Sequence, residues 1–311
     1  MEGGSHGAER TVPGHDAIRA RVMGAGATHP LRAMRGDPAL RDHLIGPPGR
    51  HGRPRGVAIA GGRRPNGREV LQLLDWLTAV SSVALRMSVP ADRRMASAGL
   101  DLDVIAGRLC EVHFFDTPDL TLLRSGIMLQ ARRTQRADDA TVVRLRRAIP
   151  TTLSRAVRGS KNLTLELDVT LGAYTVSAAL AGRRPAGAVR AAVSGARRLE
   201  RLFTREQRAF FAEHAPAGVD WNGLVPLGPV VVVLLQPLRC GSARPSSVEQ
   251  WYHPCEIPRV EVSTTVTPRN AHRVFTDELR FLRRHGVVAP AAQEWSTHRM
   301  VHLLARPLRC A

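Results

Sequence analysis

Charged or polar side chains recur at every second position in three otherwise apolar segments of this sequence. TVVRLR carries Arg144 and Arg146, LTLELDV carries Glu166 and Asp168, and RVEVSTTV carries Glu261 and Ser263. Because side chains alternate across a strand, each set lies on one face, opposite an apolar face. The simple interpretation is a face in solvent. The alternative is a closed barrel, inside which arginines would bind phosphate and carboxylates would hold a bridging divalent metal.

The segments that must position these residues read as short strands with a few helices. We expect strands at 80–90, 127–133, 141–147, 163–170, 173–180, 229–236 and 259–266. A long helical region is expected at 186–213, and a last helix begins at the N-cap Thr267 and stops at Gly286. This pattern favours an antiparallel α+β domain built as a barrel.

Composition separates an N-terminal segment from the rest of the chain. Residues 1–75 are rich in Gly, Pro and Arg, have no sustained periodicity until close to residue 70, and are predicted to be disordered, whereas 76–311 form the folded domain. The formal net charge of the 311 residues is +18, and an Arg bias of this kind partly reflects a GC-rich genome. The excess attracts phosphates, nucleic acid and anionic membranes without choosing among them, so the basic tail leaves nucleic acid open as a partner.

The cysteines and the apolar runs of the sequence bear on the cellular location of the protein. The four cysteines are scattered without a CxxC pair, which favours reduced thiols. The longest fully apolar run, Val230 to Leu235, is far too short to span a bilayer, and the N-terminus lacks an apolar core of the signal-peptide type. We therefore predict a cytoplasmic protein with no membrane partner.

One segment carries a recognisable signature. Residues 111–133 read EVHFFDTPDLTLLRSGIMLQARR, which resembles the FDTxDLxLxxxGxxLRxR pattern of the CYTH proteins. That family includes class IV adenylate cyclases, thiamine triphosphatases and inorganic triphosphatases. The resemblance extends over residues 78–303, identifies the chain as a divergent bacterial member, and implies an eight-stranded antiparallel tunnel with flanking helices that binds a triphosphate with a divalent metal.

The resemblance assigns phosphate binding to arginines. Arg86 in SVALR matches the lysine of the family's first-strand ExExK, Arg132 in LQAR keeps the second arginine of LRxR, and Arg144 and Arg146 match the basic pair of TxKxR. Gln130 replaces the first arginine of LRxR. Arginine in place of lysine keeps the charge and the phosphate affinity but removes a group whose pKa is easily tuned.

The resemblance assigns metal binding to carboxylates. Glu166 and Asp168 match the family's ExE strand, and Glu261 matches the glutamate of ExSxK, so these three would hold Mg²⁺ or Mn²⁺. The two first-strand glutamates are absent, because Ser82 and Ala84 stand at their positions. That loss removes metal ligands and any general base from this strand, and no catalytic residue is assigned.

Three functions stay open from the sequence. The first is a metal-dependent triphosphatase or adenylate cyclase acting on a triphosphate or polyphosphate in a basic tunnel. The second is a catalytically impaired binder of polyphosphate or nucleotide on the same fold. The third is a nucleic-acid-binding protein, for which the aromatic content of 4% provides few stacking platforms.

Three residues near the signature have structural interpretations. Asp116 and Thr117 begin a DTPD sequence that is typical of a turn and a helix start, although a role at the site is the alternative. His113 precedes the turn, and we expect it to be a packed strand residue rather than a ligand.

Overall fold

The structure is a computed structural model that describes residues 67–91, 100, 102–148, 150–171, 173–240, 245–290 and 293–306. None of the helices in these ranges combines the length and the apolarity needed to cross a bilayer. The predicted disordered segment 1–75 lies mostly outside the described residues. Its predicted boundary at residue 75 falls inside a helix, α3 (Gly67–Ala79).

Nine strands of the described chain close into one barrel, in the order β1-β5-β6-β4-β3-β2-β7-β8-β9. They are β1 (Ser82–Pro90), β2 (Arg108–Asp116), β3 (Ile127–Thr134), β4 (Asp139–Arg146), β5 (Leu163–Thr170), β6 (Ala173–Arg184), β7 (Val225–Leu238), β8 (Ser246–Tyr252) and β9 (Arg259–Val266). The α+β barrel is confirmed. The prediction of eight antiparallel strands is wrong in detail, because β8 adds a strand and β1 pairs with β5 in parallel.

The outer face of the barrel is apolar and is covered by helices. Leu85 of β1 is buried together with Leu77 of α3, and Val89 of the same strand is buried with Leu282 of α9. Burial of such side chains is the main favourable term for folding. Two of the three core clusters therefore include side chains of the outer face, and part of the inner face is left for polar residues.

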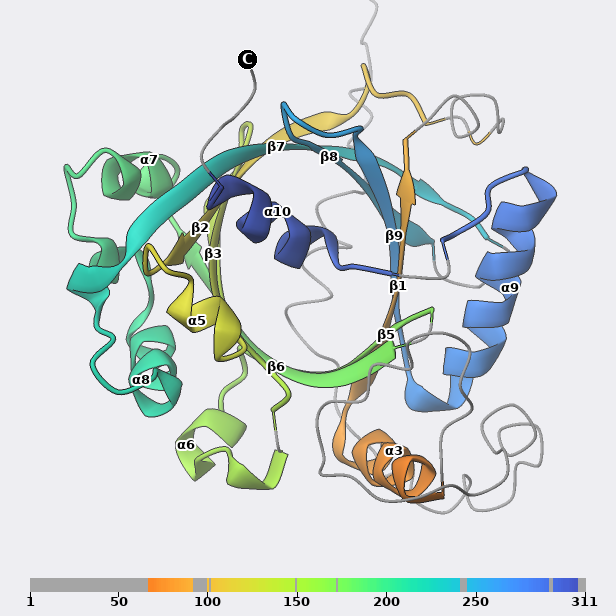
Figure 1. The fold of residues 1–311 in the computed structure, drawn as a ribbon, viewed down its shortest axis with the longest axis horizontal. Coiled ribbons are helices and arrows are strands. Elements are labelled where there is room, and N and C mark those ends of the chain that lie inside the picture. Colours follow the sequence, from red (N-terminus) through yellow and green to blue (C-terminus); the bar gives the residue numbers. More distant parts are fainter. Residues whose placement is uncertain are drawn as a thin grey trace, which may run out of the picture.

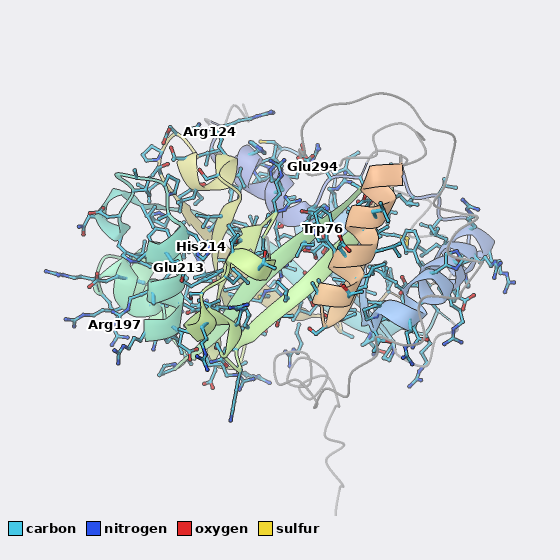
Figure 2. The ribbon with its side chains drawn as sticks, turned by 90° about the horizontal axis from the view of Figure 1, so that it is seen from below. Trp76, Arg124, Arg197, Glu213, His214 and Glu294 are labelled. Atoms are coloured by element: carbon cyan, nitrogen blue, oxygen red, sulfur yellow. The ribbon has the colours of Figure 1, made fainter. Side chains whose placement is uncertain are left out.

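Figure 1 shows the helices around the barrel, seen end on. They are α3, α5 (Thr121–Arg124), α6 (Arg155–Arg158), α7 (Ala188–Val193), α8 (Arg205–His214), α9 (Ala271–Arg284) and α10 (Ser296–Leu304). α10 lies across the opening, whereas the others lie around the wall (Figure 1). Figure 2 shows α3 against the strands, with Trp76 facing them. The Trp76 ring meets the edge of Tyr174 at 5.9 Å between ring centroids.

The helix predictions had mixed outcomes. The expected continuous helix at 186–213 is instead α7, a 3-10 turn (Leu199–Leu202) and α8. Gly195 takes a φ of 78° just after α7, and Thr204 starts α8 anew with a capping box to Gln207. The last helix is confirmed, since Thr267 and Pro268 begin a 3-10 turn that leads into α9, and Gly286 follows its end with a φ of 73°.

The cysteines are not all reduced. Cys110 and Cys240 are free and buried, whereas Cys255 is disulfide-bonded. The prediction of reduced thiols is therefore wrong for Cys255. Disulfide formation depends on the proximity of two thiols in space, which their spacing along the sequence does not give.

Candidate anion-binding site in the barrel

The strand register turns all the predicted phosphate- and metal-binding residues toward the inside of the barrel. Residues directly opposite in neighbouring strands share a face. Such pairs link the strands round the wall: Ala84 with Asp168, Glu166 with Ser177, Ser177 with Arg146, Arg144 with Met128, Arg132 with Val112, Glu249 with Glu261, and Ser263 with Arg86; β7 joins through Val112 with Val230 and Val232 with Trp251. The sequence-based alternative of a solvent face is excluded for these strands.

Asp168 is the centre of the charged group, and its side chain is 0% exposed. It accepts hydrogen bonds from Nε of Arg86 at 3.2 Å, from Nη1 of Arg144 at 3.4 Å and from the hydroxyl of Ser177 at 2.5 Å. The Ser177 hydroxyl in turn accepts from Nη1 of Arg144 at 2.9 Å. One buried carboxylate thus holds two guanidinium groups from opposite sides of the β5 strand.

The other two predicted metal ligands also face these arginines. Glu261 accepts from Nη1 of Arg86 at 3.3 Å, and Glu166 lies 3.9 Å from Nη1 of Arg144. Burial opposes the positive charge of Arg86, but Asp168, Glu261 and Glu166 outweigh that effect and raise its pKa. Arg86 therefore stays cationic inside the barrel.

Arg132 forms a separate pair that the sequence did not reveal. Its Nη1 and Nη2 donate to the two oxygens of Glu249 on β8, at 2.7 and 3.3 Å. Burial opposes the charge of Arg132, but Glu249 outweighs it and raises the pKa. Glu249 and Ser177 are thus site residues that sequence reasoning missed. The available signal was their alternation with apolar residues in SSVEQWY and AYTVSAAL.

Arg146 differs from the other predicted phosphate ligands. Its guanidinium carbon lies 3.9 Å from the ring centroid of Trp295, the residue before α10. Within the described residues, Arg146 forms no ion pair with a carboxylate. Burial lowers its pKa to about 10; Asp168 opposes this shift, and the nearby Arg144, Arg147 and Arg86 add to it. The group is still charged near neutral pH, and an anion would relieve the repulsion.

The carboxylates do not form a ready metal site. Each of Glu166, Asp168 and Glu261 faces an arginine, and the described residues contain no group of three or more His, Cys, Asp or Glu side chains placed to hold a metal. A Mg²⁺ ion would have to displace guanidinium groups from these oxygens. The predicted Mg²⁺ or Mn²⁺ cofactor therefore stays a prediction.

The remaining part of the inner face is apolar. Val112 and Phe114 of β2, Val232 of β7 and Trp251 of β8 form one buried cluster with Met300 and Val301 of α10; its other buried members are Cys110, Leu123, Met128 and Val230. Strands β9, β1, β5, β6 and β4 carry most of the charged residues, and β2, β7 and β8 carry most of the apolar ones. Arg132 and Glu249 bring charge to the border of the apolar side.

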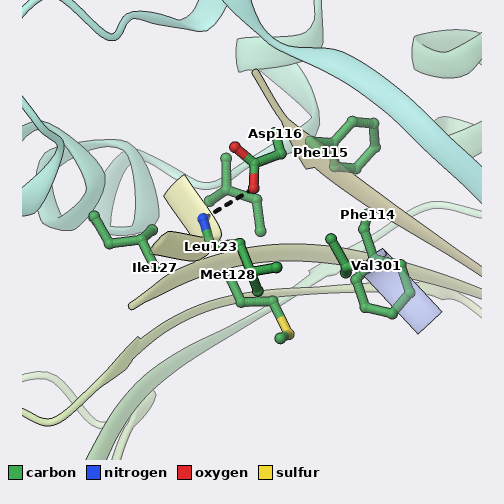
Figure 3. A pocket seen from close by; sticks show the side chains of 8 residues that line it. Phe114, Phe115, Asp116, Leu123, Ile127, Met128 and Val301 are labelled. Atoms are coloured by element: carbon green, nitrogen blue, oxygen red, sulfur yellow. Dashed lines mark hydrogen bonds between the residues drawn. The ribbon is translucent and has the colours of Figure 1, made fainter. Parts of the chain in front are cut away.

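Asp116 has the structural role that the sequence favoured. It is 3% exposed and accepts the backbone N–H groups of Thr117, Leu122 and Leu123 at 2.7, 2.8 and 2.9 Å. Figure 3 shows the bond to Leu123 at a small pocket between β2, α5 and α10. These bonds fix the turn after β2 and the start of α5. His113 is buried in β2 as expected, with 6% of its surface exposed.

Comparisons with known proteins bear on the fold. No family model and no curated protein matches the sequence. The structure is similar to a putative adenylyl cyclase from Hippeastrum described as having a dominant triphosphatase activity, with 15% identity, 73% of this chain and 99% of that chain covered, and a TM-score of 0.50. It is also similar to a putative adenylate cyclase from Bacillus halodurans, with 11% identity, 70% and 98% covered, and a TM-score of 0.48. An identity of 15% establishes the fold alone: the chain shares the barrel fold of the Hippeastrum protein, which is the fold that the sequence resemblance implied.

Proposed function

We propose that the protein binds triphosphate- or polyphosphate-type anions inside its barrel. The observation that carries this proposal is Arg146, a half-buried guanidinium on the inner face without a carboxylate partner among the described residues. Arg86, Arg132 and Arg144 lie on the same face. Guanidinium groups bind phosphate through paired, charge-assisted hydrogen bonds, and several of them around one chamber would match a chain of phosphoryl groups.

The existing ion pairs make this site selective for a strong anion. A ligand at Arg86 or Arg144 must compete with Asp168, whereas a ligand at Arg146 displaces no carboxylate. We therefore expect the first phosphoryl group to bind at Arg146 and the next ones to extend toward Arg144. A single phosphate gains one such contact, and an oligophosphate gains several.

A thermal-shift panel tests the proposal, with tripolyphosphate, ATP and long-chain polyphosphate, each with and without Mn²⁺. A ligand at a hundredfold its Kd stabilises the folded state by about 2.7 kcal/mol, which is a measurable rise in Tm. The Arg146→Ala and Arg144→Ala variants should lose most of the rise. Arg197→Ala is the matched control, because this arginine is exposed on the outside of the molecule (Figure 2). Absence of any shift with every oligophosphate would exclude the proposal.

Turnover is a second candidate, favoured by the triphosphatase activity named for the Hippeastrum protein. Glu166, Asp168 and Glu261 would have to hold the Mg²⁺ or Mn²⁺, which when bound would polarise a phosphoryl oxygen. The engagement of all three with arginines supports a catalytically impaired binder instead. Metal-dependent phosphate or cyclic-nucleotide release that Glu261→Ala abolishes would establish an enzyme.

A nucleic-acid partner and a cytoplasmic location stay predictions from the sequence. The first depends on the N-terminal tail, so deletion of residues 1–68 should abolish DNA binding if the tail carries it. DNA affinity that survives this deletion would assign it to the folded domain.

A further inference from the structure

The segment before α10 touches the charged part of the inner face at two points. The indole ring of Trp295 stacks on the guanidinium of Arg146 at 3.9 Å. The backbone N–H of the next residue, Ser296, donates to Oε2 of Glu261 at 3.3 Å. The chain thus places an aromatic ring at the one predicted phosphate ligand that has no ion pair within the described residues.

The rest of α10 is anchored elsewhere. Met300 and Val301 are 1% and 2% exposed within the apolar cluster. Arg299 binds both oxygens of Glu256 at 2.6 Å and Glu294 at 3.0 Å. Release of the whole helix would expose the apolar side chains to water and break these bonds, which makes such a movement costly.

Trp295 itself is not a member of the apolar cluster that holds α10. It is half-buried, it precedes the first helical residue, and its backbone is extended with φ −69° and ψ 131°. A side-chain rotation can therefore move the ring while Met300 and Val301 keep α10 in the apolar cluster. A cation–π contact is also weaker than a paired guanidinium–phosphate contact, so phosphate would replace the ring on Arg146.

We propose that Trp295 is a gate residue that covers Arg146 in the free protein and swings aside when an anion binds there. This inference rests on the proposed function and adds to it a competitor built into the chain. The ring keeps the repelled, partly desolvated guanidinium covered until a ligand with enough charge displaces it. Trp295 is thus a positioning residue, and it acts through Arg146 rather than on the ligand.

The test compares tripolyphosphate affinity by calorimetry in single and double variants. Trp295→Ala removes the competitor and should tighten binding roughly tenfold, the effect expected for loss of one partly desolvated cation–π contact. Trp295→Phe keeps a stacking ring and should stay near the wild type. Trp76→Ala is the matched control, because its ring packs on Tyr174 outside the barrel. Circular dichroism and Tm confirm that each variant is folded.

The Arg146→Ala background separates a gate from a general structural effect. There, Trp295→Ala should leave the residual affinity unchanged, since the ring no longer has a cation to cover. A gain that persists in this background, or weaker binding by Trp295→Ala itself, overturns the gate while leaving the proposed function intact. If neither the wild type nor any variant binds tripolyphosphate, the proposed function falls and the gate with it.

Discussion

The inner wall of the barrel has two parts with opposite chemistry. On β1, β4 and β5, Arg86 and Arg144 surround the fully buried Asp168. On β2, β7 and β8, Phe114, Val232 and Trp251 form an apolar cluster that α10 covers. The first part keeps its charges by pairing them inside a closed wall, and the second has become an extension of the hydrophobic core.

The difference shows where a ligand can bind without unfolding the domain. The charged part holds its ion pairs through side chains that an anion can replace one at a time. The apolar part is filled by α10, and anything that binds there must first expose the cluster to water. The segment from Trp295 into α10 touches both parts, because Trp295 stacks on Arg146 and Met300 lies in the apolar cluster.

The largest loss of stability is expected from Asp168→Ala, which removes the carboxylate at the centre of the charged part. The substitution leaves Arg86 and Arg144 facing each other without their shared carboxylate. Removal of one partner of a buried ion pair costs about 3–5 kcal/mol. Urea denaturation should show a loss of this size in the free energy of unfolding.

Added tripolyphosphate distinguishes a charge effect from a packing effect in this variant. If the cost comes from uncompensated guanidinium groups, the anion should restore more stability to Asp168→Ala than to the wild type. Asp168→Asn keeps the side-chain volume and should behave similarly. Equal stabilisation of the wild type and both variants would show that the anion does not reach this part of the barrel.

Met300→Ala removes a buried side chain from the apolar part. Met300 is 1% exposed in the cluster with Phe114 and Trp251, so its truncation leaves a cavity under α10. Buried Met→Ala substitutions cost about 2–5 kcal/mol, and we expect the lower end because α10 is short and can settle. The loss should not depend on oligophosphate, in contrast to that of Asp168→Ala. Rescue by tripolyphosphate would mean that the two parts are one site.

Ser177→Ala makes a smaller change at the border of the charged group. The hydroxyl donates to Asp168 and accepts from Arg144, and both partners keep their ion pair when it is removed. A hydrogen bond to a charged group contributes about 1.5–3 kcal/mol, and we expect the lower end, measured by urea denaturation. Ser81→Ala, at an exposed hydroxyl, is the control and should be close to neutral. A loss as large as that of Asp168→Ala would show that the hydroxyl, rather than the carboxylate, organises the group.

The part of this arrangement that lies within single strands could be predicted from the sequence. Alternation places Arg144 with Arg146 and Glu166 with Asp168 on one face whatever the tertiary structure. The DTPD turn also depends on local hydrogen bonds to Asp116, which its sequence encodes. Local periodicity therefore predicted which charged side chains share a face, and turn chemistry predicted the turn after β2.

The partners across the barrel could not be predicted in this way. Arg132 and Glu249 are 117 positions apart, and their contact exists only because β3 and β8 lie in one closed sheet. Trp295 reaches Arg146 through a helix whose weak pattern in STHRMVHLL gave no reason to place it over the barrel. The same limit explains why the carboxylates looked available for a metal, when the structure gives each of them an arginine.

The smallest change in stability is expected from protonation of His113, which lies on the outer face of β2, behind the apolar part of the wall. Burial lowers its pKa from 6.5; Glu111 opposes this shift, Arg133 adds to it and Asp139 opposes it again. The unfolded chain therefore binds a proton at this histidine more readily than the folded one. The contribution of neutral His113 to the free energy of unfolding is fully present above about pH 6.5 and is lost as the pH drops below that value. His113→Gln should lose less stability than the wild type on acidification, as measured by urea denaturation at several pH values. Burial also lowers the pKa of His298, so His298→Gln is the necessary comparison. If His113→Gln keeps the wild-type pH dependence, the protonation that weakens the fold occurs at α10 or elsewhere, and not behind the apolar wall.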